Sequence, residues 1–544
     1  MNKILNKIFF LSLILGLIIF SATVTSAEDI GNGKKIIYIP TDSRPVNFIQ
    51  TVEVAEKLGY EIWLPPEIFL GTGPNTEQLG NPELLWDWLN QNVANADAAV
   101  ISIDAMLYGS LVGSRKHELT PEEILERAKK FEQLRKENPN LPIYAFGTVM
   151  RTPNYNWAEV TTKNIPESDY YGRYGLKIFQ YTALKDKEEV QGISAAERKE
   201  MERLQSEVPE KAMQDWFGRR AKNYNASKYL VDLTRNGAFQ YFLLSGDDSA
   251  FFCQTNLECR HLREYGADIG KEKFQVISGA DEIGMLMLSR AINNDLHYIP
   301  FVSIGYNVGK GGDTVPKFSN EKISESLEGA IISVGGVRVP NPENADLVLA
   351  IHTRPNGKTL NADSKKNQVK PHTGIGSYMQ LLKGYLKNDY PVGVVDISTS
   401  NGADNALMQR LKKEKLQFKI RAYGGWNTAT NTSGFLIGAG VLTNRMTDED
   451  IYTLLLTRYL DDWAYQSNVR TQINNGLIWT IPGDGNAWNL GTRQEGLEKL
   501  TSDLLSEFAA KNIFLPRGYT LKDIQARFGW GRTFESDITF ELEN

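Results

Sequence analysis

Cysteine is almost absent from the sequence, which has only Cys253 and Cys259 in 544 residues. This scarcity excludes a small fold held together by many disulfides, because such folds need a high density of cysteines. The two cysteines lie six residues apart without a neighbouring histidine pair, so they do not form a zinc site. The sequence allows either a disulfide between them or two unpaired thiols.

The sequence also lacks the short motifs that identify several large enzyme classes. It contains no HExxH, no GxSxG nucleophile elbow, no P-loop and no GxGxxG after an expected strand, and its five histidines are dispersed. These absences argue against a zincin protease, an α/β-hydrolase, a P-loop nucleotidase and a dinucleotide-dependent oxidoreductase. We therefore predict no cofactor and no metal ligands.

Positive charge is not in excess. The formal net charge is −6, from 60 Lys and Arg against 66 Asp and Glu, and removal of Lys3 and Lys7 with an N-terminal signal would make it −8. This balance gives no support for a nucleic acid or an anionic membrane as a partner. The content of 41% hydrophobic and 23% charged residues is that of a globular protein. As a partner we expect a carbohydrate or another small polar substrate.

One long apolar run stands at the N-terminus. Lys3 and Lys7 precede the apolar residues 8–22, and small residues follow. This layout predicts a secretory signal peptide at residues 1–27, so we expect a secreted or cell-envelope protein with no stable membrane span after cleavage. An uncleaved anchor is the alternative, but the run of about 15 residues is shorter than the roughly 20 that span a bilayer.

The rest of the chain alternates between short apolar runs and helical segments. The runs predicted to be strands are residues 35–40, 60–64, 97–103, 142–147, 238–244, 274–277 and 299–303, followed by 330–334, 347–351, 392–397 and 418–423. Nearly continuous apolar strands with helices between them predict an α/β fold whose parallel sheets are buried on both faces.

The mature chain is longer than a single core usually supports, so we expect two or three domains. The first α/β domain, residues 28–310, is predicted to be a (β/α)8-type barrel, with a doubly wound sheet as the alternative. A polar, helical insertion interrupts it near residues 154–221. A smaller Rossmann-like or flavodoxin-like α/β domain is expected at residues 311–445, and a mostly helical C-terminal segment at 446–544.

Polar residues follow the expected strands abruptly. They are Asp42 and Arg44, Asp104, Arg151, Asp247 and Asp248, Asp281 and Glu282, and, after later strands, Asp396, Trp426 and Asn427. The carboxyl ends of parallel strands gather on one face of a sheet, so we expect these side chains to line one pocket. Any one of the acids could instead cap the next helix, but helix caps do not need arginines.

The adjacent Asp247 and Asp248 are the predicted catalytic residues. Two neighbouring carboxylates after a buried strand repel each other, which raises the pKa of one and lowers that of the other. General acid catalysis requires such an arrangement, whereas a helix cap followed by a first-turn acid is the alternative.

Three arginines and one tryptophan are candidates for substrate binding. Arg44, Arg115 and Arg151 could bind a carboxylate, sulfate or phosphate group, or could form structural ion pairs. Trp426 beside Asn427 could stack on a sugar ring, or could be a core residue.

Four strings, at residues 38–45, 244–249, 279–282 and 422–428, together resemble an exported bacterial family catalogued as domain of unknown function number 4127. The resemblance covers nearly the whole mature chain and implies no established activity. The strand followed by paired aspartates also resembles the barrel glycosidases that remove N-acetylhexosamines by substrate-assisted catalysis. That resemblance, limited to the pair and its setting, implies that Asp247 orients an acetamido group and Asp248 protonates the leaving oxygen.

These observations lead us to expect an extracytoplasmic glycoside hydrolase that acts on a cell-wall or environmental glycan, with an N-acetylhexosamine as the sugar that the resemblance implies. A metal-assisted hydrolase of phosphate or amide bonds at the same carboxylates is a second hypothesis. A non-catalytic, two-lobed protein that binds a glycan or another solute is the third.

Overall fold

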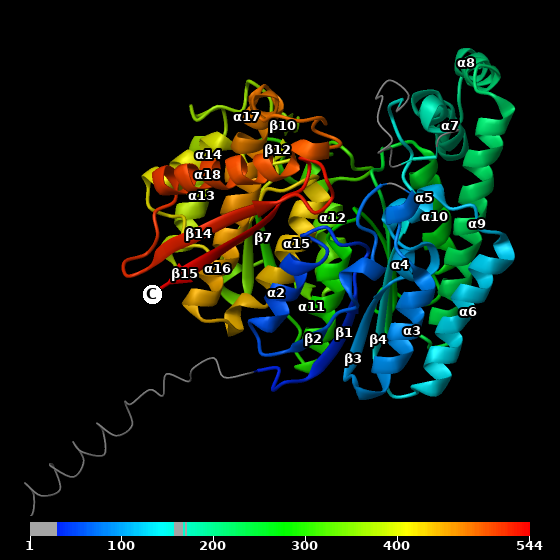
Figure 1. Cartoon of the computed structure of the whole chain (residues 1–544), viewed down its shortest axis with the longest axis horizontal. Helices are drawn as coiled ribbons and strands as arrows, with labels where there is room; N and C mark the ends of the chain where they lie inside the picture. Colours follow the sequence, from blue (N-terminus) through cyan, green and yellow to red (C-terminus); the bar gives the residue numbers. More distant parts are fainter. Residues whose placement is uncertain (1–29, 75, 157–166, 169–170) are drawn as a thin grey trace, which may run out of the picture.

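Two parallel sheets form the framework of the molecule (Figure 1). The computed structural model describes residues 30–74, 76–156, 167–168 and 171–544, so the predicted signal peptide lies outside the described residues. Every ladder within the two sheets is parallel, which confirms the predicted α/β class. Among the described residues, no helix has both the length and the apolar character needed to cross a bilayer.

The first sheet has the strand order β2-β1-β3-β4-β5-β6. Its strands are β1 (Lys35–Ile39), β2 (Glu61–Trp63), β3 (Ala98–Ser102), β4 (Ile143–Val149), β5 (Tyr241–Gly246) and β6 (Phe274–Ser278). Because β1 lies between β2 and β3, the strand order reverses beside the carboxyl end of β1. Crevices at such a reversal are common ligand sites in open α/β sheets.

The second sheet has the order β13-β11-β9-β7-β8. Its strands are β7 (Phe301–Tyr306), β8 (Val337–Arg338), β9 (Leu347–His352), β11 (Val392–Asp396) and β13 (Ala422–Gly424). The short strands β10 (Leu360–Asn361) and β12 (Thr399–Ser400) pair beside it, and β14 (Thr520–Arg527) and β15 (Asp537–Glu543) form an antiparallel hairpin near the C-terminus.

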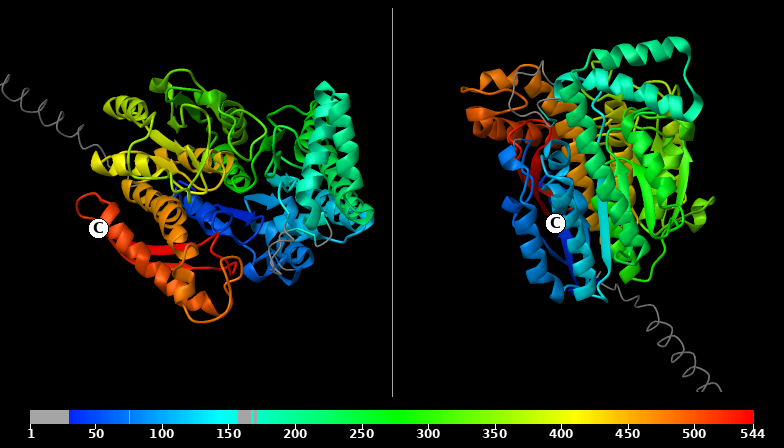
Figure 2. Two further views of the ribbon diagram at one scale, coloured as in Figure 1. Left: turned by 90° about the horizontal axis from the view of Figure 1, so that it is seen from above. Right: turned by 90° about the vertical axis from the view of Figure 1, so that its right-hand side faces the viewer.

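Helices cover the sheets and connect their strands. Those around the first sheet are α2 (Ile49–Glu56), α3 (Pro82–Asn92), α4 (Ile103–Tyr108), α5 (Leu111–Lys116), α6 (Pro121–Glu137), α7 (Gly175–Gln191), α8 (Ala195–Ser206), α9 (Glu210–Arg235), α10 (Gln254–Tyr265) and α11 (Ile283–Asp295). Those that follow are α12 (Ile323–Ser333), α13 (Ile375–Lys387), α14 (Asn405–Lys413), α15 (Ala429–Gly440), α16 (Asp448–Arg458), a π-helical segment (Tyr459–Val469), α17 (Arg470–Asn474) and α18 (Gln494–Asn512). Figure 2 shows α7–α9 at one side of the molecule and the orange and red C-terminal elements at the other.

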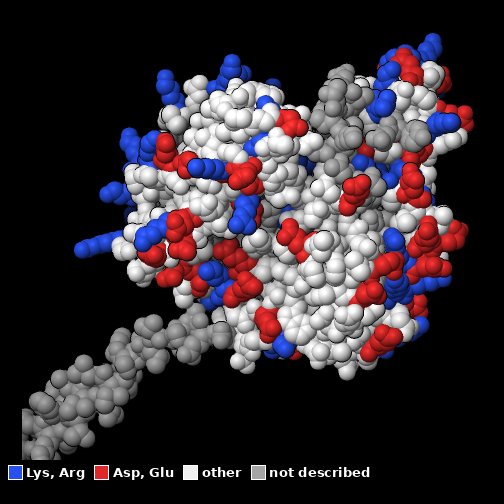
Figure 3. All heavy atoms as spheres, viewed as in Figure 1, with Lys and Arg blue, Asp and Glu red and all other residues white. Residues whose placement is uncertain are grey.

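The first sheet is buried on both faces because successive residues of each strand point to opposite sides. Along β1, Ile36 and Tyr38 belong to a core shared with the second sheet, whereas Ile37 and Ile39 belong to a core on the other face. On the surface, acidic and basic side chains are intermingled on the face drawn in Figure 3.

Three expectations from the sequence differ from the structure. Residues 299–303 were expected in the first unit, but β7 pairs with β8 and β9 in the second sheet. Residues 330–334 lie at the end of α12 and just beyond it, not in a strand, because the buried apolar residues from Ile323 to Val334 recur with a helical period that a five-residue window hides. The C-terminal segment ends in the β14–β15 hairpin and is therefore only partly helical.

The two cysteines are both free and buried.

Helices α11 and α15 pack against each other between the two sheets. Gly434 and Gly438 lie one turn apart on α15 and face α11: a Cβ atom at Gly438 would lie 2.8 Å from the Met285 Cγ atom, and one at Gly434 would lie 2.4 Å from the Glu282 Cγ atom. The close approach of the two helices therefore depends on the missing side chains.

We expect Gly438→Ala to lower the free energy of unfolding by about 1–3 kcal/mol, because the added methyl group overpacks the α11–α15 contact. Urea unfolding followed by circular dichroism measures the change. The matched control is Gly384→Ala in α13, where a Cβ atom would meet nothing within 4 Å. That variant should be neutral or more stable by up to about 1 kcal/mol, because alanine favours a helix. Equal effects of the two changes would contradict the packing argument.

Candidate functional site

A cavity of about 420 Å³ lies where the carboxyl ends of the two sheets meet the C-terminal segment. The first unit contributes Arg44, Arg115, Arg151, Asp247, Asp248 and Asp281, the second contributes Asn401, Asn427 and Asn431, and the C-terminal segment contributes Trp488, Trp530, Arg532 and Phe534. Residues separated by several hundred positions thus surround one space, as expected for the carboxyl ends of parallel strands.

Asp247 and Asp248 follow β5 and bind different arginines. The Arg115 guanidinium donates a hydrogen bond to Asp247, and Arg151 Nη1 lies 2.9 Å from Asp248 Oδ2. Asp247 is buried, whereas the side chain of Asp248 is 34% exposed. Neither acid caps the next helix, because α10 begins at Gln254 with Cys253 as its N-cap. The helix-cap alternative therefore does not explain the pair.

The environment of Asp248 raises the pKa of its carboxyl. Burial raises the pKa of the Asp248 carboxyl, and the charge on Asp247 raises it further, while Arg151 acts in the opposite direction. Its backbone φ of 38° lies in the left-handed region, which turns the chain sharply between the two carboxylates. The pair is thus divided into one acid that is held by Arg115 and one that is able to carry a proton.

Arg44 connects the ends of β1 and β6. Its Nε atom lies 3.0 Å from Asp42 Oδ1, and its Nη2 atom lies 2.6 Å from Asp281 Oδ1. The other oxygen of Asp281 accepts hydrogen bonds from Asn427 at 2.9 Å and from Asn431 at 3.3 Å, which are residues of the second unit. Asp42 is fully buried behind Arg44, so it positions that arginine and does not face the cavity. Burial raises the pKa of Asp281, although Arg44 opposes the shift.

The aromatic wall of the cavity was not anticipated from the sequence. Trp488 and Phe534 stack with their ring centroids 6.2 Å apart, and Arg532 lies over the Trp530 ring at 5.0 Å. These residues belong to the C-terminal segment, which was expected to be a separate helical region. Their signal in the sequence was the recurrence of aromatic residues there, but nothing local indicated that the segment returns to the strand ends.

Glu167 is a second residue that the sequence did not reveal. Its carboxylate accepts a hydrogen bond from Arg151 Nε at 2.6 Å and another from the Tyr171 hydroxyl at 2.5 Å. It is fully buried although it lies in the polar insertion. Arg151 is therefore held between Glu167 and Asp248 and is fixed at the cavity wall.

Besides Asp42, four other predicted residues do not line this cavity. Asp104 is buried, accepts a hydrogen bond from the Thr148 amide at 2.8 Å, and has its pKa raised to about 7 by burial. Glu282 lies between α11 and α15. Trp426 is a core residue that is 5% exposed. Asp396 ends β11 and accepts a hydrogen bond from the Tyr423 hydroxyl of β13 at 3.0 Å. Buried strand ends and core packing account for these positions.

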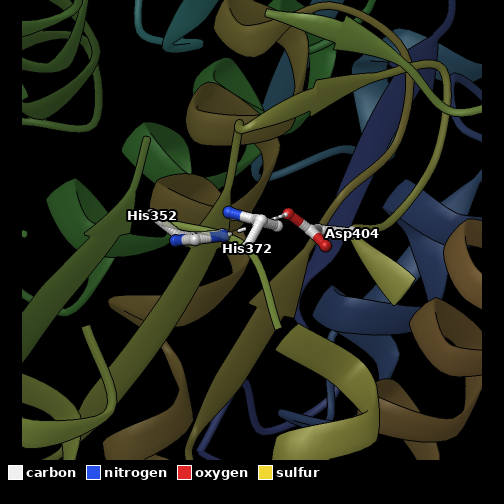
Figure 4. Close-up of side chains that lie close together, drawn as sticks. All are labelled: His352, His372 and Asp404. Atoms are coloured by element: carbon white, nitrogen blue, oxygen red, sulfur yellow. Dashed lines mark hydrogen bonds and ion pairs between the residues drawn. The ribbon is translucent and has the colours of Figure 1, made fainter. Parts of the chain in front are cut away.

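The dispersed histidines of the sequence come together in part. His352, His372 and Asp404 form a group in which one ligand atom from each residue lies within 4.8 Å of the others (Figure 4). This group is separate from the residues that line the cavity. Among the described residues, it is the group with the composition of a metal site.

The comparisons with known proteins identify a family. The family model described as Protein of unknown function (DUF4127) matches residues 36–539, which is nearly the whole chain. The resemblance drawn from the four strings is thereby confirmed. No curated protein matches the chain.

We expect stability to depend on the protonation of Glu282. Burial raises the pKa of its carboxyl from 4.5 to about 8, so the protonated form stabilises the fold. This contribution is complete below about pH 4.5 and is lost as the pH rises through about 8. Relative to Glu282→Gln, the free energy of unfolding of the native chain should therefore fall by up to about 1.4 kcal/mol per pH unit in this window.

Urea unfolding at pH values from 4 to 9 measures this difference. The matched control is Glu264→Gln at an exposed position of α10, which should follow the pH dependence of the native chain. If Glu282→Gln also follows the native chain, burial of the Glu282 carboxyl has no effect on stability.

Proposed function

The chain belongs to the DUF4127 family, and we propose that it is an exported glycoside hydrolase-like enzyme that acts on a cell-wall or environmental glycan by acid catalysis. One observation carries the proposal. Asp247 and Asp248 are adjacent and line one cavity, but Arg115 holds the first while the pKa of the second is raised. One carboxyl that carries a proton beside one that is ionised is the arrangement needed for glycosidic bond cleavage.

Asp248 is the proposed general acid. Its partly exposed carboxyl protonates the leaving oxygen, and Arg151 fixes its orientation through the 2.9 Å contact. Asp247, held by Arg115, stabilises positive charge that develops on the sugar or orients an acetamido group, as in the glycosidases that the pair resembles. Asn427 and Asn431, which bind Asp281, offer further polar groups at the cavity wall.

The cavity wall suits a sugar that carries an anionic group. Trp488 and Trp530 provide flat aromatic surfaces of the kind on which sugar rings stack. Arg115 Nε and Arg151 Nη2 are buried and have no hydrogen-bonding partner among the described residues. A carboxylate, sulfate or phosphate on the substrate would interact favourably with these two arginines.

Two other features bear on the alternatives. The carboxylates of the cavity already bind arginines, so a metal-assisted hydrolase at Asp247, Asp248 and Asp281 has less support. The open strand order β2-β1-β3-β4-β5-β6 favours the doubly wound alternative for the first unit over the (β/α)8-type barrel. We propose export because of the apolar run within residues 1–27.

We expect Asp248→Asn to lower kcat by at least about 100-fold, because the amide cannot donate the proton. The assay incubates the protein with peptidoglycan, chitin oligomers and uronic acid-containing glycans, and detects released products by mass spectrometry.

The matched control for that variant is Asp268→Asn, which removes an exposed partner of Arg235 far from the cavity and should leave the rate unchanged. Full hydrolysis by Asp248→Asn would eliminate Asp248 as the general acid. Tight glycan binding by the native chain without product release on long incubation would instead identify a binding protein.

Trp488→Ala should raise KM for the glycan by about 2- to 10-fold with little change in kcat, since an aromatic contact contributes about 0.5–1.5 kcal/mol. Steady-state kinetics on the substrate found above separates the two parameters. Trp479→Ala is the matched control, because Trp479 is 62% exposed and does not line the cavity. If both variants behave alike, the aromatic wall does not bind the sugar.

A further inference from the structure

A second group of polar side chains lies at the carboxyl ends of the second sheet, away from the residues of the cavity. His352 is the last residue of β9, His372 lies just before α13, and Asp404 is the N-cap of α14. His372 Nε2 lies 2.5 Å from Asp404 Oδ2, and His352 Nε2 lies 3.3 Å from the same oxygen. Figure 4 shows that the three side chains converge from different elements.

Both ring nitrogens of His372 face oxygen acceptors, Nδ1 the Thr373 carbonyl and Nε2 the Asp404 carboxylate. His372 Nδ1 lies 3.0 Å from the Thr373 carbonyl oxygen, which can only accept, so Nδ1 carries a proton. In the neutral imidazole, Nε2 then presents a lone pair to the Asp404 carboxylate at 2.5 Å, which is repulsive. The same carboxylate oxygen already accepts a hydrogen bond from the Ser398 hydroxyl at 2.5 Å. An added proton removes the repulsion at this distance, and a metal ion removes it once the two ligand atoms separate to the spacing of a shared coordination sphere.

We propose that His352, His372 and Asp404 bind a divalent transition metal ion of the Zn²⁺ class. Two imidazoles and one carboxylate form a donor set that this class of metal prefers, and three protein ligands leave a fourth position for solvent. One ligand atom from each residue lies within 4.8 Å of the others, so small side-chain movements bring all three onto one ion. A cation satisfies both imidazole lone pairs and the carboxylate without any added proton.

His372 and Asp404 are held by outer hydrogen bonds, as metal ligands usually are. The Ala406 amide donates to Asp404 Oδ1 at 2.9 Å, and the Thr373 carbonyl oxygen fixes the tautomer of His372. His352 is completely buried, and its Nδ1 atom has no hydrogen-bonding partner among the described residues. Arg354 Nη2 lies 3.8 Å from Asp404 Oδ2, and its positive charge favours an anion such as hydroxide as the fourth ligand.

The segment that carries His372 also supports the cavity. His372 belongs to the connection between β9 and α13, and β10 in that connection pairs with β12. Asn361 of β10 accepts a hydrogen bond from the Asn401 side chain. The backbone N–H of Asn401 donates a hydrogen bond to the Asn427 carbonyl oxygen. Asn401 and Asn427 both line the cavity. A metal at His352, His372 and Asp404 therefore holds in place the connection that supports one wall of the cavity.

Metal binding by the full chain tests the proposal without any assay of hydrolysis. After treatment with a chelator and its removal, the protein is titrated with ZnCl₂ by isothermal calorimetry. We expect one equivalent to bind, with a visible spectrum of tetrahedral Co²⁺ when cobalt replaces zinc. His372→Ala and Asp404→Asn should each weaken binding by more than about 100-fold, because even outer-shell partners contribute 10- to 100-fold.

The matched control is His261→Ala, since His261 also pairs with a carboxylate, Glu189, at 2.7 Å but belongs to no group of three ligands. Zn²⁺ binding by this variant should equal that of the native chain. If His372→Ala does not fold, as judged by circular dichroism, His372→Gln takes its place. No bound Zn²⁺ in the native chain, or equal binding by the His372 and Asp404 variants, would show that the group is only a proton-linked ion pair.

Discussion

The buried carboxylate of Asp281 is the contact on which the arrangement of the two sheets depends. One of its oxygens binds Arg44 from the end of β1, and the other binds Asn427 and Asn431 from the second unit. A charge taken out of water is tolerated only when its partners are in place, because the desolvation cost is otherwise not recovered. The ends of β1, β6 and β13 are therefore held close together, and the cavity is the space that remains between them.

The three aspartates that line the cavity look equivalent in the sequence, but their surroundings in the structure differ. Asp247, Asp248 and Asp281 each face an arginine, but they differ in burial and in the strength of the pairing. Burial is also the largest cause of the raised pKa values of Asp104 and Glu282, the buried acids outside the cavity. The chemistry proposed here follows from the exposed fraction of Asp248, which gives its proton a path to a substrate.

Position relative to the strands explains which residues of the two sites were predictable from the sequence. Asp247, Asp248, Arg44 and Arg151 stand directly after apolar strands, so topology alone predicts that they meet at one edge. Trp488 and Glu167 follow no strand, and their approach to the cavity depends on how the C-terminal segment and the polar insertion fold back. His352 and His372 are twenty residues apart with no characteristic spacing, and only the pairing of β9 with β11 brings Asp404 between them.

The sequence by itself determined the parallel α/β class, the family and the strand ends at which chemistry is concentrated, because apolar periodicity and abrupt polar switches are local properties of a chain. Only the tertiary structure decided that β7 belongs to the second sheet, that residues 330–334 are not a strand, and that Trp426 is a core residue. It also decided which acids share a space. Those outcomes depend on contacts between residues far apart in the chain, and the free energy of such packing is not encoded in any short window of sequence.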